Sequence, residues 1–175
     1  MADQTQATFR HTLYLLCAAL FGSQVLFFVA VAAGLGGAGF HAPPAWAVVL
    51  VAVFAAVELM VVPQAGRRVA PVLPGADAAA TRVAVVQAVR TMTLLRFAII
   101  EVVTLLSVAL AFTVGDGGSF VCLVGVVVAL AMGVTQVWPG RRMLRAVRAR
   151  LESDGAPVDL EGALDAPAPA RTPAT

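Results

Sequence analysis

The chain has 175 residues, of which 60% are hydrophobic and only 13% are charged, and its formal net charge is +2. Soluble domains are about 45–50% apolar and about 25% charged, so this composition and a mean hydropathy of +0.90 exclude an ordinary water-soluble domain. The basic residues are all arginine, a bias typical of GC-rich coding that suggests a bacterial source.

Four apolar runs are long enough to cross a membrane. A helix needs about 20 apolar residues to span about 30 Å of hydrocarbon, where its backbone polar groups must be satisfied within the helix. The runs are residues 13–35, 46–62, 94–114 and 120–138, and they predict an all-α integral membrane four-helix bundle. A secretory signal is the alternative for the first run, but that run exceeds the usual 7–15 residues of a signal core.

Short connectors and proline positions predict six segments along the chain. Gly/Pro-rich or glycine-containing turns join the first span to the second and the third to the fourth, which indicates two tandem hairpins. The segments are a cytoplasmic N-terminus (1–12), the first transmembrane hairpin (13–62), a cytoplasmic connector with a helical extension (63–93), the second transmembrane hairpin (94–138), a basic amphipathic helix (139–152) and a disordered tail (153–175).

The arginines that flank the spans predict the orientation. Arg10 precedes the first run, four arginines lie between the second and third runs, and five lie at residues 139–152, directly after the fourth. Arginine near span ends favours the cytoplasmic side. The four-crossing arrangement puts all of these arginines on one side, so we expect both ends in the cytoplasm and a multi-pass protein of the bacterial inner membrane.

The ends of the second and fourth spans resemble each other. Pro63 is followed by Arg67 and Arg68, and Pro139 is followed by Arg141 and Arg142. A tandem duplication would predict pseudo-twofold symmetry about the membrane normal. The alternative is ordinary boundary chemistry, because proline ends a helix and arginine binds lipid phosphates.

The segment after the fourth span predicts a short helix with two faces. Leu144, Val147 and Leu151 share one face at helical spacing, and such a basic helix can lie on an anionic leaflet. No aromatic residues interleave with its arginines, so we expect no nucleic-acid partner. Lipid headgroups or a partner protein are expected to contact six arginines, namely Arg67, Arg68, Arg141, Arg142, Arg145 and Arg148.

Two carboxylates and one amide inside the spans are the candidate site. Glu58 and Glu101 lie at similar depths from the arginine-rich side, and Gln24 lies in the middle of the first span. Ionisable groups in a bilayer are costly, so function is the default hypothesis. If the glutamates face each other, they would bind a proton or a cation together with Gln24. The alternative is a structural role, because polar side chains also hold membrane helices together.

No other constellation carries chemistry. Cys17 and Cys122 lie in apolar runs, and no group of Cys, His, Asp or Glu has metal-ligand spacing. We find no nucleophile motif, phosphate loop or dinucleotide fingerprint. The sequence therefore predicts no metal, no cofactor and no enzymatic activity.

The tandem hairpins and the glutamates within the spans resemble the layout of the duplicated proteolipid (c-ring) subunits of rotary ATPases, over about residues 10–145. That family carries its ion-binding carboxylate on the second helix of a hairpin, which is the position of Glu58. The resemblance implies an ion site at Glu58 only, because Glu101 is on the first helix of its hairpin. More loosely, the chain resembles small four-span bacterial membrane proteins.

Two functions remain open from the sequence. The first is a structural, assembly or regulatory membrane protein whose partners are the bilayer and either further copies of itself or another membrane protein. The alternative is an oligomeric proton- or cation-translocating subunit that uses Glu58 and Glu101.

Overall fold

A computed structural model describes residues 8–35, 41–64, 70–72, 75, 77–138, 140–155 and 157–166. The protein is all-helical in these ranges. In chain order its elements are α1 (Phe9–Gly34), α2 (Ala45–Val61), α3 (Ala78–Val114), α4 (Gly118–Met132), the π-helical turn η2 (Gly133–Val137), α5 (Arg141–Leu151) and α6 (Leu160–Asp165).

Four helices are long and apolar enough to cross a membrane. They are Phe9–Gly34, Ala45–Gln64, Ala78–Val114 and Gly118–Val137, the second including a 3₁₀ turn after α2 and the last including η2. Each overlaps one of the four predicted spans, so the all-helical fold with four membrane-length helices is confirmed.

Local sequence signals define where the helices begin and turn. The hydroxyl oxygen of Thr8 accepts a hydrogen bond from the His11 amide at the start of α1, and the Asp77 carboxylate accepts one from the Ala80 amide at the start of α3. These side chains satisfy amide groups that the first turn of a helix leaves free. Gly115, with φ +67°, ends α3 in a conformation that favours glycine.

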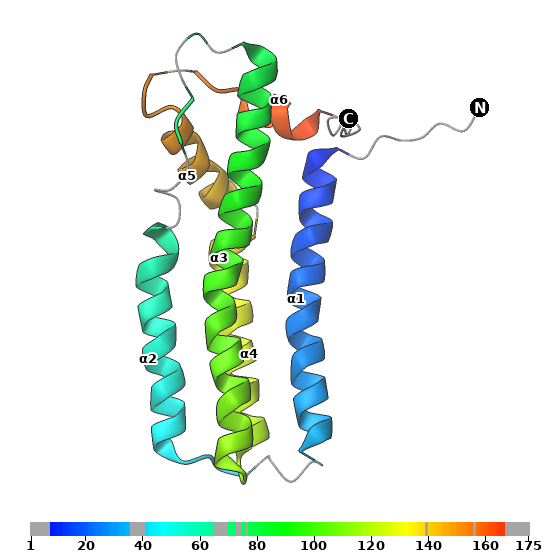
Figure 1. Cartoon of the computed structure of the whole chain (residues 1–175), viewed down its shortest axis with the longest axis vertical. Coiled ribbons are helices and arrows are strands. Elements are labelled where there is room, and N and C mark those ends of the chain that lie inside the picture. The colour runs from blue at the N-terminus through cyan, green and yellow to red at the C-terminus, as the bar shows by residue number, and fades with distance from the viewer. Residues whose placement is uncertain are drawn as a thin grey trace, which may run out of the picture.

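The α3–α4 pair forms the centre of the bundle, and α1 and α2 lie on opposite sides of it (Figure 1). Each outer helix contacts both central helices, whereas α1 and α2 make little contact with each other. Only the second of the two predicted hairpins therefore has its two helices packed against one another along their length.

Small residues explain why α3 and α4 approach so closely. A Cβ atom added at Gly125 would lie 2.2 Å from both side-chain atoms of Ser107, and one added at Gly118 would overlap the carbonyl oxygen of Ala111. In lipid no hydrophobic force drives helices together, so their association depends on close van der Waals contact. Small residues allow two backbones to approach closely enough to make that contact. The central pair is consequently the best-packed part of the membrane region.

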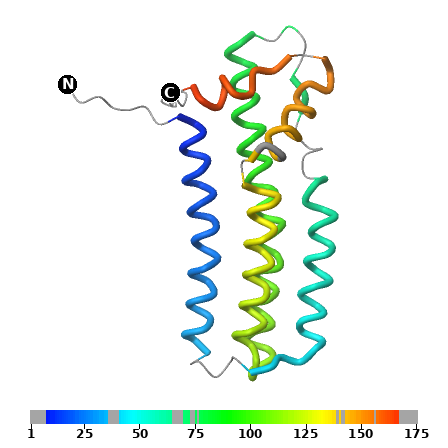
Figure 2. Tube along the Cα trace, turned by 180° about the vertical axis from the view of Figure 1, so that it is seen from behind, coloured from blue at the N-terminus to red at the C-terminus, as the bar shows by residue number. Residues whose placement is uncertain are grey.

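One end of the bundle carries an additional apolar core, and we call it the capped end. It is formed by the first turns of α1, the first four turns of α3, α5 and α6 (Figure 2). The opposite end holds the turns at residues 41–44 and 115–117 and is called the turn end. The buried side chains of the capped end include Leu13, Val85, Val89, Met92, Met143, Val147, Leu151, Leu160 and Leu164.

In the structure, the apolar face of the basic helix expected at residues 139–152 packs against the rest of the protein. Met143, Val147 and Leu151 in α5 are buried within the capped end, against α3. The apolar side chains of α5 that could lie on a lipid leaflet pack instead on the extension of α3. Because that extension carries its own apolar stripe, the two faces cover each other and remove apolar surface from water.

Part of the tail expected to be disordered, residues 153–175, is helical in the structure. Residues 160–165 form α6, whose N-cap is Asp159. Leu160, Ala163 and Leu164 are buried against the capped end. Three apolar residues at helical spacing are enough to bind a short helix to an existing core, although they could not fold alone. The rest of the tail, residues 167–175, lies outside the described residues.

Candidate functional site

Gln24 and Glu58 are buried in the membrane region, and each belongs to a separate group of polar contacts with α3. The first joins α1 to α3. The side-chain amide of Gln24 donates to Glu101 Oε2 at 2.6 Å, and Thr104 Oγ1 donates to the Gln24 carbonyl oxygen at 2.7 Å. The Gln24 side chain is 1% exposed. Its amide nitrogen and its amide oxygen each have a hydrogen-bond partner in the middle of the bundle.

The spacing of Glu101 and Thr104 explains how a single glutamine reaches both. Residues three apart lie on the same face of a helix, and here that face is turned toward α1. Sequence reasoning identified Gln24 and Glu101 but missed Thr104. The signal was present, because a hydroxyl three residues from a carboxylate within a span can complete the hydrogen bonding of an amide.

The second group joins α2 to α3 through Glu58. This side chain is 4% exposed, and its Oε1 atom accepts a hydrogen bond of 3.0 Å from the backbone amide of Val103. Its Oε2 atom is buried and has no hydrogen-bond partner among the described residues. The carboxyl group also lines a cavity of about 330 Å³ between α2 and α3, whose other walls are the apolar side chains of Phe54, Val57, Val61, Ala98, Ile99 and Val102.

The two glutamates thus have different partners. Glu101 is bonded to α1, and Glu58 approaches α3 from α2, while α1 and α2 lie on opposite sides of the central pair. No hydrogen bond joins the two carboxyl groups, both of which the structure describes. Two carboxyl groups that share a proton would be in direct contact. Glu58 and Glu101 do not form that arrangement.

Arg96, on α3, lies beside the last residues of η2. It is 6% exposed, and its Nη1 atom donates to the backbone carbonyl of Gln136 at 2.8 Å. The wider turn of η2 is closed by a hydrogen bond from the Trp138 amide to the Gly133 carbonyl. A cation beside the carbonyl end of a helix is electrostatically favourable.

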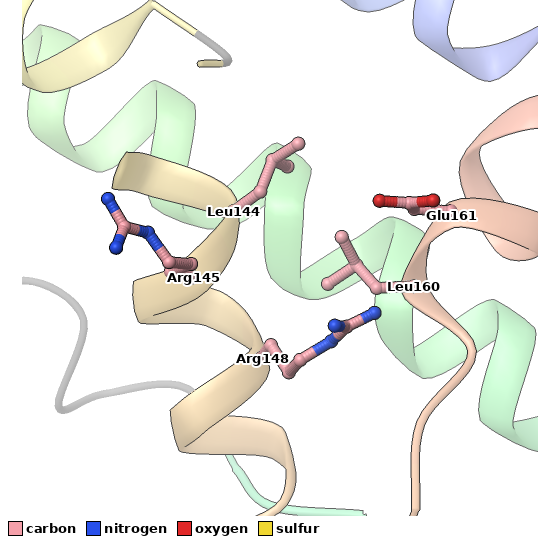
Figure 3. Close-up of a pocket in the computed structure, with 5 residues that line it drawn as sticks. All are labelled: Leu144, Arg145, Arg148, Leu160 and Glu161. Atoms are coloured by element: carbon pink, nitrogen blue, oxygen red, sulfur yellow. The ribbon is translucent and has the colours of Figure 1, made fainter. Parts of the chain in front are cut away.

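The predicted contact arginines fall into three groups. Arg67 and Arg68 lie outside the described residues, and the backbones of Arg141 and Arg142 begin α5 while their side chains are not described. Arg145 and Arg148 are exposed on α5. Together with Leu144 they form one wall of a cavity of about 490 Å³, and Leu160 and Glu161 of α6 form the other (Figure 3).

Within the described ranges, no three Cys, His, Asp or Glu side chains gather where they could hold a metal ion. Cys17 and Cys122 are fully buried free thiols. Polar chemistry in the membrane region is therefore concentrated in the two groups at Gln24 and Glu58.

Comparison with protein-family models, with curated proteins and with solved structures gives no match. The fold by itself defines the class, which is an all-helical protein with four helices long and apolar enough to cross a membrane.

Proposed function

We propose that this chain is a small multi-pass protein of the bacterial inner membrane with a structural, assembly or regulatory role that is not catalytic. Its two termini would lie in the cytoplasm, because the capped end carries Arg82, Arg90, Arg145, Arg148 and Arg150, and arginine near span ends favours the cytoplasmic side. The turn end carries Asp116 and His41 among its described residues.

The observation that carries this proposal is the way in which the buried carboxyl groups are used. Glu101 is bonded to Gln24 of α1, and Glu58 is bonded to the backbone of α3. Each polar contact links a peripheral helix to the central pair, which is how polar side chains hold membrane helices together. The capped end adds a folded, arginine-rich surface outside the spans, suited to a partner or to the membrane surface.

Proton flux into proteoliposomes tests the proposal. The purified protein would be reconstituted into vesicles that carry a pH-sensitive dye, and a potassium diffusion potential would be applied with valinomycin. The expected rate equals that of protein-free vesicles, for the wild type and for Glu58→Gln alike. A flux that depends on protein and falls at least tenfold in Glu58→Gln would overturn the proposal.

One observation favours the alternative of an oligomeric proton- or cation-translocating subunit. The Oε2 atom of Glu58 is buried without a hydrogen-bond partner among the described residues, beside the apolar cavity between α2 and α3. Protonation of that atom, or a hydrogen-bond donor from a second copy of the chain, would remove the cost of burying it without a partner. Carbodiimide reacts with protonated carboxyl groups. Labelling of Glu58 that titrates near pH 7, and not near the solution value of about 4.3, would support this alternative. Glu58→Gln and Glu101→Gln are the controls.

A further inference from the structure

The cavity between α5 and α6 is large enough to hold a small ligand. Its volume is about 490 Å³, within the range of roughly 300–1,000 Å³ of small-molecule sites. The two glutamates of the membrane region play no part in it. Leu144, Arg145 and Arg148 come from one wall, and Leu160 and Glu161 from the other.

Opposite charges enter this cavity from facing helices. Figure 3 shows that Arg148 extends from α5 toward α6, and that Glu161 extends from α6 toward α5. Within the ranges that the structure describes, the two side chains form no ion pair with each other, although both line the same space. In the view of Figure 3 they stand apart, with the side chain of Leu160 drawn between them. A ligand that carried both a negative and a positive group could contact both at once.

The chemistry of the two side chains identifies the ligand groups. A guanidinium group binds phosphate through charge-assisted hydrogen bonds, and Arg148 supplies one that extends toward α6. A carboxylate accepts hydrogen bonds from an ammonium group. Leu144, which is half-buried, supplies apolar surface beside the charges. A phosphate and a primary ammonium on a short linker, with an apolar remainder, match this lining.

The position of the cavity indicates where such a group would come from. Helix α5 begins three residues after Trp138, and Trp138 lies 5.6 Å from Tyr14, measured between ring centroids. Tryptophan and tyrosine concentrate at the membrane interface. The headgroup layer is about 5–7 Å thick on each side of the hydrocarbon, so a cavity next to α5 is within reach of lipid headgroups.

We propose that the cavity between α5 and α6 binds the phosphoethanolamine headgroup of a membrane lipid. Arg148 holds the phosphate, and Glu161 holds the ammonium group. The first part of the glycerol and the acyl chains contacts Leu144. The site selects phosphatidylethanolamine over lipids that have the same phosphate but lack N–H donors.

Native mass spectrometry of the full chain, released from detergent with defined lipids, measures this selection. The probes are phosphatidylethanolamine, its mono- and dimethyl forms, phosphatidylcholine and phosphatidylglycerol, all with the same acyl chains. Bound fractions are expected to fall along the methylation series, with phosphatidylethanolamine at least about threefold above phosphatidylcholine, the size expected for one exposed charged contact.

Two variants separate the contributions of the two charges. Glu161→Gln should remove the preference for phosphatidylethanolamine while keeping phosphatidylcholine binding. Arg148→Gln should lower the binding of both lipids by threefold or more. The matched controls, Arg90→Gln and Asp154→Asn, change exposed charges at the same end of the bundle that do not line the cavity, and they should bind as the wild type does. Both cavity residues are exposed, so these variants should remain folded, and gel-filtration profiles check this.

Two results would overturn the proposal. Equal binding of the five lipids, or an unchanged preference for phosphatidylethanolamine in Glu161→Gln, would show that Glu161 does not bind the ammonium group. Full displacement of phosphatidylethanolamine by millimolar free phosphoethanolamine would assign the cavity to a soluble ligand in place of a lipid. Neither result bears on the proton-flux experiment, because no cavity residue takes part in the polar groups at Gln24 and Glu58.

Discussion

Arg10 and Asp165 form an ion pair between the first turn of α1 and the last residue of α6. The distance from Arg10 Nε to Asp165 Oδ1 is 2.8 Å, and Arg10 Nη2 donates to Oδ2 at 3.1 Å. The pair joins residues at nearly opposite ends of the chain. It closes the capped end over α3, yet both side chains are substantially exposed, so water and salt screen the attraction.

The contribution of this pair to stability is predicted to be smaller than that of the apolar face beside it. Asp165→Asn should lower the free energy of unfolding by less than about 1 kcal/mol, because exposed ion pairs contribute little. Leu164→Ala should lower it by about 2–4 kcal/mol, because Leu164 is almost fully buried and truncation leaves a cavity. Thermal unfolding in detergent, with limited proteolysis at residues 152–159, measures both. A larger effect of Asp165→Asn than of Leu164→Ala would contradict this prediction.

Gln24 is predicted to stabilise the contact between α1 and the central pair. Gln24→Leu removes two hydrogen bonds and leaves Glu101 and Thr104 without this partner, so the free energy of unfolding should fall by about 1–2 kcal/mol. Glu101→Gln keeps an acceptor oxygen and should change it by less than about 0.5 kcal/mol. Unfolding of the reconstituted protein by SDS titration measures these differences. Gln87→Leu, at an exposed position of α3, is the control.

Gly125 is predicted to set the distance between α3 and α4. Gly125→Ala should destabilise the protein by about 1–3 kcal/mol, since the new Cβ would overlap Ser107 and overpacking displaces the helices. Adding Ser107→Gly should recover most of the loss. Gly22→Ala serves as control, because its Cβ would meet no atom within 4 Å and alanine favours the helix. Equal destabilisation at Gly22 and Gly125 in thermal melts would refute the close contact.

Labelling with a membrane-impermeant maleimide tests the proposed orientation. Asp154→Cys, at the capped end, should react only when the cytoplasmic face is open, and Asp116→Cys, at the turn end, should react in intact spheroplasts. The native Cys17 and Cys122 are fully buried, so they should remain unlabelled and need no replacement. Labelling of both new cysteines from the same side would reject the four-crossing arrangement.

The amino-acid sequence by itself determined the helical spans. Runs of about 20 apolar residues can satisfy their backbone in lipid only as helices, and no knowledge of neighbours is needed for that conclusion. The residues of the candidate site were also identifiable, because Gln24, Glu58 and Glu101 stand out within apolar surroundings. Their partners were not, because hydrogen bonding depends on which helices become neighbours.

The tertiary structure alone decided three matters. It separated the two glutamates onto different helix contacts, because α1 and α2 pack on opposite sides of α3 and α4. It buried the apolar stripe of α5 in the protein and ordered α6, since the extension of α3 offers both of them an apolar surface. A stripe of leucine and valine is equally suited to lipid and to another helix, so its sequence cannot distinguish the two, and only the position of the neighbouring helix does.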